Sequence, residues 1–272
     1  MSREINKDTR LCISLAGRPG NFGTRFHNFL YQELDLNYIY KAFTTTDIEA
    51  AVGGVRALGI RGCAVSMPFK EVCIPFLDQL DTSATAIESV NTIVNDDGFL
   101  RAYNTDYIAI ARLLSQYQVP KETSFILRGS GGMAKAVVAA LRDAGFKYGH
   151  IIARNERTGK LLADNYGYQW QAEVGDLVAD MLINVTPIGM AAGTEANTLA
   201  FEPATIDQAK IVFDVVALPV ETPFIRYGRA HGKQIISGAE VIAIQAVEQF
   251  VLYTGVRPTD EQVERAAAHA RS

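Results

Sequence analysis

The residues from Ser124 to Ala134 read SFILRGSGGMA, and a helix-period segment follows through Leu141. An apolar run that enters a glycine-rich turn and then a helix matches the G-x-G-x-x-G/A fingerprint of dinucleotide-binding folds. Gly129 permits the tight turn, and Gly131 lets the backbone approach a pyrophosphate, which the free N–H groups of the helix start attract. The turn therefore predicts a dinucleotide site, and an ordinary glycine-rich loop is the alternative. The expected lining residues are Gly129, Ser130, Gly131, Gly132, Met133 and Ala134.

The next predicted strand ends near Ile152, and Arg154 and Asn155 follow it. NAD sites usually place an acidic residue about 20 residues after the glycine turn, where it binds the ribose 2′-hydroxyl. An arginine stands there instead, and a guanidinium can bind a 2′-phosphate and stack on adenine. We therefore predict NADP as the cofactor, with Arg154 and Asn155 in its site. Arg157 could assist and Glu156 would oppose phosphate binding, and a solvated arginine is the alternative.

Apolar runs alternate with helix-period segments on both sides of this turn. Expected strands cover 11–15, 38–43, 63–66, 90–94, 99–103, 125–127, 151–153, 181–185 and 211–216. Expected helices cover 27–34, 47–58, 69–80 (opened by Pro68), 106–116, 238–253 and 259–270. The alternation predicts mostly parallel sheets with helices on both faces, interrupted by a hairpin turn at 95–98. We predict an α/β chain of two domains with a seam near residue 106, the second a Rossmann-type, doubly wound domain.

The composition fits a globular protein and excludes several partners. Of 272 residues, 48% are hydrophobic and 21% are charged, and the formal net charge is −4. Nucleic acid and anionic membranes need a basic face, so we expect neither as a main partner. Residues 1–10 lack the apolar core of a secretory signal, and Cys12, Cys63 and Cys73 lack framework spacing, which predicts a cytoplasmic protein with reduced thiols. The four histidines stand at no ligand spacing, so no metal site is expected.

Several motifs in order resemble those of the shikimate dehydrogenase family. SMPFKE at 66–71 is similar to its T-V-P-F-K-E, SVNT at 89–92 to its A-V-N-T, and YNTD at 103–106 to its D-N-T-D. GSGG at 129–132 is similar to its G-A-G-G, and NVTPIGM at 184–190 to its N-A-T-x-x-G-M. Gly238 and Gln245 stand where that family has a glycine and a substrate-binding glutamine. The resemblance covers nearly the whole chain and points to the divergent, shikimate dehydrogenase-like branch.

The resemblance implies two domains and a small-molecule reaction. Residues 1–105 plus 238–272 would form an N-terminal α/β substrate-binding domain, and 106–237 the NADP-binding Rossmann domain. The implied activity is the NADP-dependent interconversion of shikimate, or a related hydroxylated ring carboxylic acid, and its 3-dehydro ketone, as in aromatic amino acid biosynthesis. The expected partner is this small molecule, and a homodimer is left open.

Lys70 and Asp106 are the implied catalytic residues. Alcohol oxidation by a nicotinamide cofactor needs removal of the hydroxyl proton as the hydride leaves. Lys70, in a predicted first helical turn, is a credible proton acceptor or donor, and Asp106, at a helix start, could orient it. Two unrelated surface charges are the alternative. The resemblance also implies Thr24, Ser66, Asn91, Asn104 and Gln245 as substrate-binding residues, and Thr186 and Gly238 as further cofactor-binding residues. The alternatives are turn and cap chemistry for Asn91 and Asn104, capping for Ser66, and a solvated helix face for Gln245.

The segment expected to bind the substrate carboxylate departs from the family. Residues 21–25 replace its H-S-x-S-P, with Phe22 at the first serine and Thr24 at the second when one counts back from His27. Ala217 stands where the family has a substrate-contacting tyrosine. Candidate replacements for the carboxylate site are Arg18 and Arg25. These departures leave the chemistry in place and change the expected substrate.

Two other functions stay open on the sequence. A folate-linked methylene dehydrogenase shares a two-domain plan and a catalytic lysine, but the motifs at 89–92 and 103–106 fit it poorly. A dinucleotide-binding sensor with little catalysis is motivated by the altered segment at 21–25. Turnover of a ring acid, turnover of a folate, and cofactor binding without turnover distinguish the three.

Overall fold

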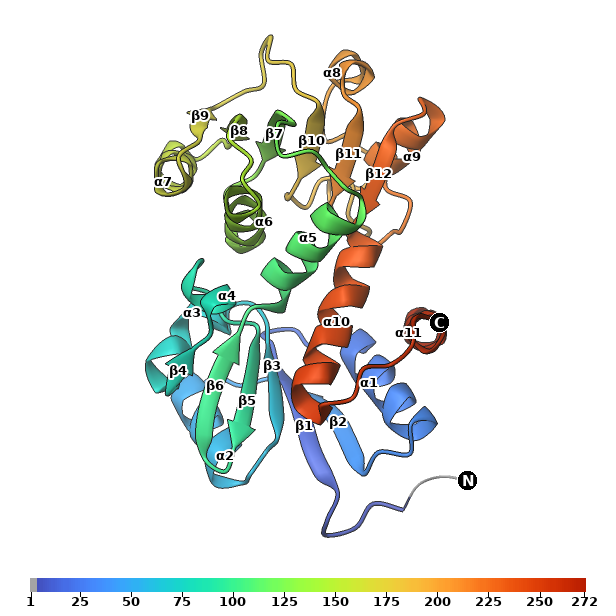
Figure 1. Cartoon of the computed structure of the whole chain (residues 1–272). Coiled ribbons are helices and arrows are strands. Elements are labelled where there is room, and N and C mark those ends of the chain that lie inside the picture. Colours follow the sequence, from blue (N-terminus) through green and yellow to red (C-terminus); the bar gives the residue numbers. More distant parts are fainter. Residues whose placement is uncertain (1–3) are drawn as a thin grey trace. The chain divides into compact units, whose positions relative to one another are not determined.

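The computed structural model describes residues 4–272 and divides the chain into two compact units. The first unit holds the residues up to Thr105 together with Ala243–Ser272, and the second holds Asp106–Ile242. Each unit is built on one six-stranded sheet (Figure 1). The helix α10 (Gly238–Thr254) belongs to both, because its first turn lies in the second unit and the rest in the first.

The sheet of the second unit is parallel throughout, in the order β12-β11-β10-β7-β8-β9. Its strands are β7 (Phe125–Arg128), β8 (Gly149–Ile152), β9 (Gln169–Gln171), β10 (Met181–Asn184), β11 (Ile211–Asp214) and β12 (Gln234–Ser237). The chain order reverses between β7 and β10, which is the doubly wound arrangement whose ligands bind outside the carboxyl ends of the strands. The predicted Rossmann-type fold is confirmed.

Helices cover both faces of this second sheet, as crossover connections between parallel strands require. The helices of this unit are α5 (Thr105–Gln116), which precedes the sheet, and α6 (Gly132–Asp143), α7 (Glu156–Tyr166), α8 (Pro203–Gln208) and α9 (Pro223–Ala230). The central strands are apolar because both faces are buried. The sequence analysis missed β9 and β12, which are short edge strands with exposed glutamines and so lack the apolar run that marks β7 and β10.

The sheet of the first unit is mixed, in the order β2-β1-β3-β5-β6-β4. Its strands are β1 (Arg10–Leu15), β2 (Tyr38–Phe43), β3 (Gly62–Val65), β4 (Gln79–Leu80), β5 (Thr92–Asp96) and β6 (Phe99–Tyr103). β1, β2 and β3 are parallel, whereas β5 runs antiparallel to β3 and β6. The predicted hairpin is present, and Asp97 and Gly98 adopt the positive φ angles, 52° and 92°, that a tight two-residue turn needs.

The helices of the first unit are α1 (Phe22–Glu33), α2 (Ile48–Ala57), α3 (Phe69–Val72), α4 (Thr82–Thr85), most of α10, and α11 (Asp260–Arg271). Asp47 caps α2 and Thr259 caps α11, where their side chains accept the N–H groups of Ala50 and Gln262. The predicted helix at 27–34 begins earlier, at Phe22. The altered segment therefore forms the start of α1. This changes the directions in which the side chains of Phe22 and Thr24 point.

The predicted helix over 69–80 is wrong. α3 ends at Val72, a 3₁₀ turn covers Ile74–Phe76, and the chain then enters β4. Pro75 lacks an N–H and its ring would clash with the preceding turn of an α-helix, so the helix cannot continue. Lys70 therefore lies in a single helical turn, where a macrodipole contributes much less than the sequence argument assumed.

Candidate active site

The glycine turn after β7 has the geometry that the sequence predicts. Gly129 has a φ of +125°, and a Cβ there would lie 2.7 Å from Cγ2 of Val185. Any other residue at this position would therefore have a strained backbone and would clash with Val185. A Cβ built on Gly131 or Gly132 meets no atom within 4 Å among residues 4–272. The fully buried Ala134 packs the start of α6 on the sheet. The backbone at the start of α6 is thus accessible to a phosphate group.

A hydrogen bond joins the glycine turn to the start of α7. The hydroxyl oxygens of Ser130 and Thr158 are 2.8 Å apart. Asn155 is the N-cap of α7, where its Oδ1 accepts the Thr158 N–H at 3.1 Å. The structure therefore brings the predicted residues Ser130 and Asn155 together, and the Asn155 carboxamide serves as a cap in addition to any role toward a cofactor.

Arg154 is exposed at the carboxyl end of β8, two residues beyond Ile152. Glu156, which the sequence sets against phosphate binding, forms an ion pair with Lys160 one turn along α7 at 2.5 Å. Its carboxylate is therefore compensated by a cation on its own helix. Arg157 is also exposed.

The loops after β10 and β11 are shaped by a buried polar network. Nδ2 of Asn184 donates to Oδ1 of Asp214 at 3.0 Å and to the Ile188 carbonyl at 3.1 Å. Thr222 donates its hydroxyl to Oδ2 of Asp214 at 2.6 Å, and the Val216 N–H donates to Oδ1 at 3.1 Å. Burial raises the pKa of Asp214 to about 6, and these donors lower it by a smaller amount.

Thr186 and Gly238 have structural partners in this unit. The Thr186 hydroxyl donates to Oδ1 of Asn184 at 2.6 Å and accepts the Ile188 N–H at 3.2 Å. Its side chain thus holds the loop at 184–190, and its methyl group would lie 3.2 Å from a Cβ on Gly129. A Cβ on Gly238 would lie 2.4 Å from the carbonyl carbon of Val216, so glycine is required where α10 starts.

Asn91 is the most informative side chain of the first unit. Its Oδ1 accepts the Thr105 N–H at 2.8 Å, the Thr105 hydroxyl at 3.1 Å and the Thr92 hydroxyl at 2.9 Å. A backbone N–H can only donate, so this atom is the oxygen and the amide orientation is settled. Nδ2 then points the other way and, although buried, has no hydrogen-bond partner within residues 4–272. Its two N–H groups are available to an acceptor on a ligand.

Backbone hydrogen bonds bring the other predicted residues of this unit toward Asn91. The Val90 N–H donates to the Lys70 carbonyl at 2.8 Å, and the Val65 N–H donates to the Asn91 carbonyl at 2.8 Å. Ser66, next to Val65, is exposed, and Lys70 is half-buried. The cap of α3 is Pro68 and no side chain caps it, so Ser66 has no capping role in the described part of the chain. Ser66, Lys70 and Asn91 therefore lie on adjoining segments.

Asn104 and Asp106 flank Thr105 at the start of α5. Nδ2 of Asn104 donates to the Ser89 carbonyl at 2.9 Å, and the Asn104 N–H donates to the Ser83 hydroxyl at 3.0 Å. This fits the turn role weighed for Asn104 and engages one end of its amide. Asp106 is 4% exposed in the first turn of α5. A carboxylate so deeply buried is unlike the solvated surface charge that the alternative assumed.

Gln245 is half-buried on α10, and one helical turn further lies a residue that the sequence analysis missed. Gln249 is 6% exposed, and its Nε2 donates to the Asn91 carbonyl at 3.3 Å and to the Thr92 hydroxyl at 3.1 Å. Its i, i+4 spacing from Gln245 was the available signal, since both lie on one face of the helix.

The first turn of α1 carries the altered carboxylate segment. Phe22 stacks on Phe26 with ring centroids 5.8 Å apart, and the Thr24 carbonyl accepts Nδ2 of Asn28 at 2.8 Å. Arg25 donates to the Ser272 hydroxyl at 2.9 Å. One of the two arginines proposed for the carboxylate therefore already has a partner, while Arg18 is exposed.

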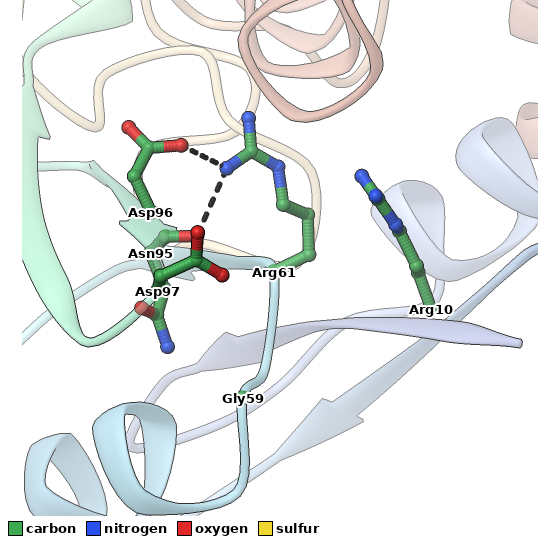
Figure 2. Close-up of a pocket in the computed structure, with 6 residues that line it drawn as sticks. All are labelled: Arg10, Gly59, Arg61, Asn95, Asp96 and Asp97. Carbon is green, nitrogen blue, oxygen red and sulfur yellow. Dashed lines mark hydrogen bonds and ion pairs between the residues drawn. The ribbon is translucent and has the colours of Figure 1, made fainter. Parts of the chain in front are cut away.

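A cavity of about 360 Å³ in the first unit lies elsewhere (Figure 2). It is lined at the amino ends of β1 and β3 and at the hairpin turn, whereas Ser66 and Lys70 follow the carboxyl end of β3. Arg61 donates to the Asn95 carbonyl at 2.9 Å and pairs with Asp96. The charges of Arg61 and Asp96 in this cavity therefore compensate one another, and we do not place the active site there.

Other features bear on the class of protein. The three cysteines are free and buried as predicted, and burial raises the pKa of Cys12 and Cys73 to about 12. Within residues 4–272, no group of three or more histidine, cysteine or acidic side chains could hold a metal ion. Over the same residues, none of the helices has both the length and the apolar character to cross a membrane.

The doubly wound sheet and its glycine turn define an α/β protein of the dinucleotide-binding class. The shikimate dehydrogenase substrate binding domain matches residues 22–93. The chain is 65% identical to the shikimate dehydrogenase-like protein of Haemophilus influenzae over 98% of this chain and 99% of that one. It therefore belongs to the shikimate dehydrogenase family, which removes the folate-linked alternative.

Two solved structures extend the comparison. A shikimate 5-dehydrogenase-like protein superposes with a TM-score of 0.97 at 64% identity, covering 99% of this chain and 100% of that one. Shikimate 5-dehydrogenase of Thermus thermophilus, solved in complex with NADP(H) and shikimate, superposes with a TM-score of 0.84 at 26% identity, covering 96% of this chain and 99% of that one.

Proposed function

We propose that this protein is an NADP-dependent oxidoreductase that interconverts a hydroxylated ring carboxylic acid, shikimate or a close relative, and its 3-dehydro ketone. The observation that carries the proposal is Asn91, whose amide is oriented by three donors and presents a buried, unpaired Nδ2 beside the segments of Ser66 and Lys70. A buried unpaired N–H is unfavourable, so a ligand acceptor such as a ring hydroxyl would stabilise it. The family relationship and the shikimate complex of the Thermus thermophilus relative support this assignment.

The second unit is the proposed cofactor domain and the first the proposed substrate domain. The open backbone at Gly131 and Gly132 and the positive φ of Gly129 fit a dinucleotide pyrophosphate. Arg154 would take the 2′-phosphate, while Asn155, Ser130 and Thr186 would line other parts of the cofactor site. NADP, when bound, supplies the hydride acceptor for alcohol oxidation.

The protein itself must remove the proton of the substrate hydroxyl. Lys70 would accept it at Nζ during oxidation and return it during reduction. Asp106, buried in the first turn of α5, would accept a hydrogen bond and orient Lys70 and the substrate hydroxyl. Asn91 and Gln245 would hold the other ring hydroxyls, and Ser66 and Thr24 the remaining polar groups.

The test is a substrate panel with the purified chain. NADP and then NAD are offered with shikimate, related hydroxylated ring acids and the same rings without the carboxylate, and NADPH formation is followed by absorbance. We expect turnover of at least one ring acid with NADP. Absence of turnover on the whole panel, with NADP bound, would instead support the sensor, which the replacement of two serines by Phe22 and Thr24 motivates.

A further inference from the structure

Arg128 occupies the point in the second sheet where the strand order reverses. It is the last residue of β7 and immediately precedes Gly129. In register it lies beside Ile152 of β8 on one side and Asn184 of β10 on the other. Both neighbouring strands lead into loops already assigned to the cofactor, so a side chain here borders the region where a dinucleotide binds.

The guanidinium of Arg128 is incompletely paired. Its central carbon lies 5.1 Å from the centroid of the Phe201 ring, and its Nε is buried without a hydrogen-bond partner in the described chain. Burial lowers the pKa of Arg128, whereas Glu173, Glu202 and Glu195 act from a distance to raise it. None of these carboxylates forms an ion pair with it in the described range, so they leave its N–H groups unoccupied. Such an arginine is unfavourable unless another acceptor is present.

A second cation lies close by. Arg154 stands two residues beyond Ile152, the register neighbour of Arg128, and its charge lowers the pKa of Arg128. Two guanidinium groups that repel each other, neither of them ion-paired within residues 4–272, thus lie at or just beyond the carboxyl ends of β7 and β8, and the more distant glutamates offset part of their charge. A phosphate monoester carries about 1.5 to 2 negative charges near neutral pH and can accept from both.

We propose that Arg128 is a specificity-determining residue that binds the 2′-phosphate of NADP together with Arg154. The inference rests on the proposed NADP site and adds a residue that no glycine-turn or strand-end rule indicates. NAD carries a hydroxyl at this position and would leave both cations without an anion. Arg128 would therefore favour NADP over NAD, with the Phe201 ring supporting the guanidinium from its other face.

The experiment is calorimetric binding without turnover. NADP, NAD and adenosine 2′,5′-bisphosphate, a probe that carries the 2′-phosphate without nicotinamide, are titrated into the unmodified chain and into Arg128→Leu and Arg128→Lys. We expect Arg128→Leu to raise the Kd for NADP and the bisphosphate by about 10- to 100-fold and to change that for NAD little. Arg128→Lys should lose less because it keeps the charge. Arg226→Leu, an exposed arginine on α9, is the matched control and should bind like the unmodified chain.

The outcomes separate this inference from the function on which it rests. If the unmodified chain binds neither NADP nor the bisphosphate, the proposed cofactor is wrong. If it binds both and Arg128→Leu binds them equally well, only the role of Arg128 is overturned. An equal loss for NADP and NAD with a lower melting temperature would show that Arg128 merely packs on Phe201. Less-than-additive loss in Arg128→Leu with Arg154→Ala would support a shared phosphate.

Discussion

Two buried asparagines, one in each unit, differ in how much of the side-chain carboxamide is hydrogen-bonded within the protein. Asn184 uses its whole carboxamide inside the protein, since Nδ2 donates to Asp214 and Ile188 and Oδ1 accepts from Thr186. Asn91 uses only its oxygen, and Nδ2 stays unpaired in the described chain. The Asn184 network is closed, meaning that both ends of the amide are paired within the protein, and it fixes a loop. The Asn91 network is open, meaning that its amide nitrogen is left for a ligand.

The same contrast extends over the two units. Of the six buried side-chain atoms without a partner in residues 4–272, five lie in the first unit, on His27, Tyr31, Asn91 and Tyr253. The remaining one is Nε of Arg128 in the second. Because a native interior rarely leaves such groups unpaired, they indicate where ligands or ordered water complete the structure. His27, Tyr31 and Tyr253 lie in one buried aromatic cluster, so an unpaired atom indicates a ligand site only where other observations agree, as at Asn91.

Matched substitutions at the two asparagines test this contrast most strongly. Asn184→Asp places a second carboxylate against buried Asp214, and we expect the free energy of unfolding to fall by about 3–5 kcal/mol at neutral pH. Asn91→Asp keeps an acceptor for Thr105 at a helix start and should fold nearly normally while binding substrate on the order of 10-fold more weakly. Urea unfolding and substrate titration measure both. Similar stability losses at the two sites would remove the distinction.

Lys70→Ala tests the chemistry beside the open network. We expect kcat to fall by roughly 10²-fold or more, the usual scale for a positioned acid or base. NADP affinity should hardly change, because Lys70 belongs to the first unit and the glycine turn to the second. Steady-state kinetics and cofactor titration check the two statements. Near-normal turnover would rule out Lys70 as the proton acceptor.

Asp106→Asn provides the companion measurement. It should also lower kcat, and the double variant with Lys70→Ala should lose less than the two separate effects combined, since the residues would act as a unit. Strict additivity would mean that Asp106 and Lys70 act independently.

Arg154→Ala tests the phosphate end of the second unit. Loss of a charge-assisted hydrogen bond should weaken NADP binding by about 1.5–3 kcal/mol and leave NAD binding nearly unchanged. Titration of both cofactors is the measurement, with Arg226→Leu again as the control. Equal affinity of the unmodified chain for NADP and NAD would contradict a 2′-phosphate site.

Acidification should act oppositely on the two units. Burial lowers the pKa of His27 in the first unit from 6.5 to about 3, so the stability it contributes is present above pH 6.5 and is lost as the pH falls toward 3. Burial raises the pKa of Asp214 in the second unit from 3.8 to about 6, so the stability it contributes is present below pH 3.8 and is lost as the pH rises through 6. Each slope should approach about 1.4 kcal/mol per pH unit between those limits.

Two probes separate these slopes between pH 4 and 6. Trp170, the single tryptophan of the chain, lies in β9 and reports unfolding of the second unit, while amide hydrogen exchange in α1 reports the first. Asp214→Asn should flatten the pH dependence seen by Trp170 and leave that of α1 alone. Parallel pH dependences at both probes would show that other groups dominate.

Phe22→Ser has the smallest expected effect. It restores one hydroxyl at the predicted carboxylate end and should raise kcat/KM for shikimate by up to about 10-fold, the scale of one hydrogen bond to a charged group. The unmodified chain should oxidise shikimate poorly and a related ring acid better. An unmodified kcat/KM for shikimate of about 10⁶ M⁻¹s⁻¹, in the upper range for enzymes, would show that Phe22 and Thr24 do not impair binding.

Local features of the chain were readable because they depend on neighbouring residues. The glycine turn, the hairpin at Asp97 and Gly98, and the cap at Asp47 each follow from backbone freedom or a nearby side chain. The prediction of a helix over 69–80 was wrong. The residues have a helical apolar periodicity, but Pro75 ends the helix and β4 pairs with β6 instead. Edge strands such as β9 and β12 carry too little apolar signal to be seen.

By itself the sequence determined the fold class and the glycine turn, because these follow from periodicity and turn chemistry. From motif spacing it also predicts the residue types at the reacting hydroxyl. Only the tertiary structure decided which side chains are already paired. Asn91 and Asn184 look alike in the sequence, yet long-range partners at Thr105 and Asp214 make one amide open and the other closed. The same holds for Arg128, whose Nε is unpaired in the described chain and whose guanidinium packs on Phe201 far along the sequence.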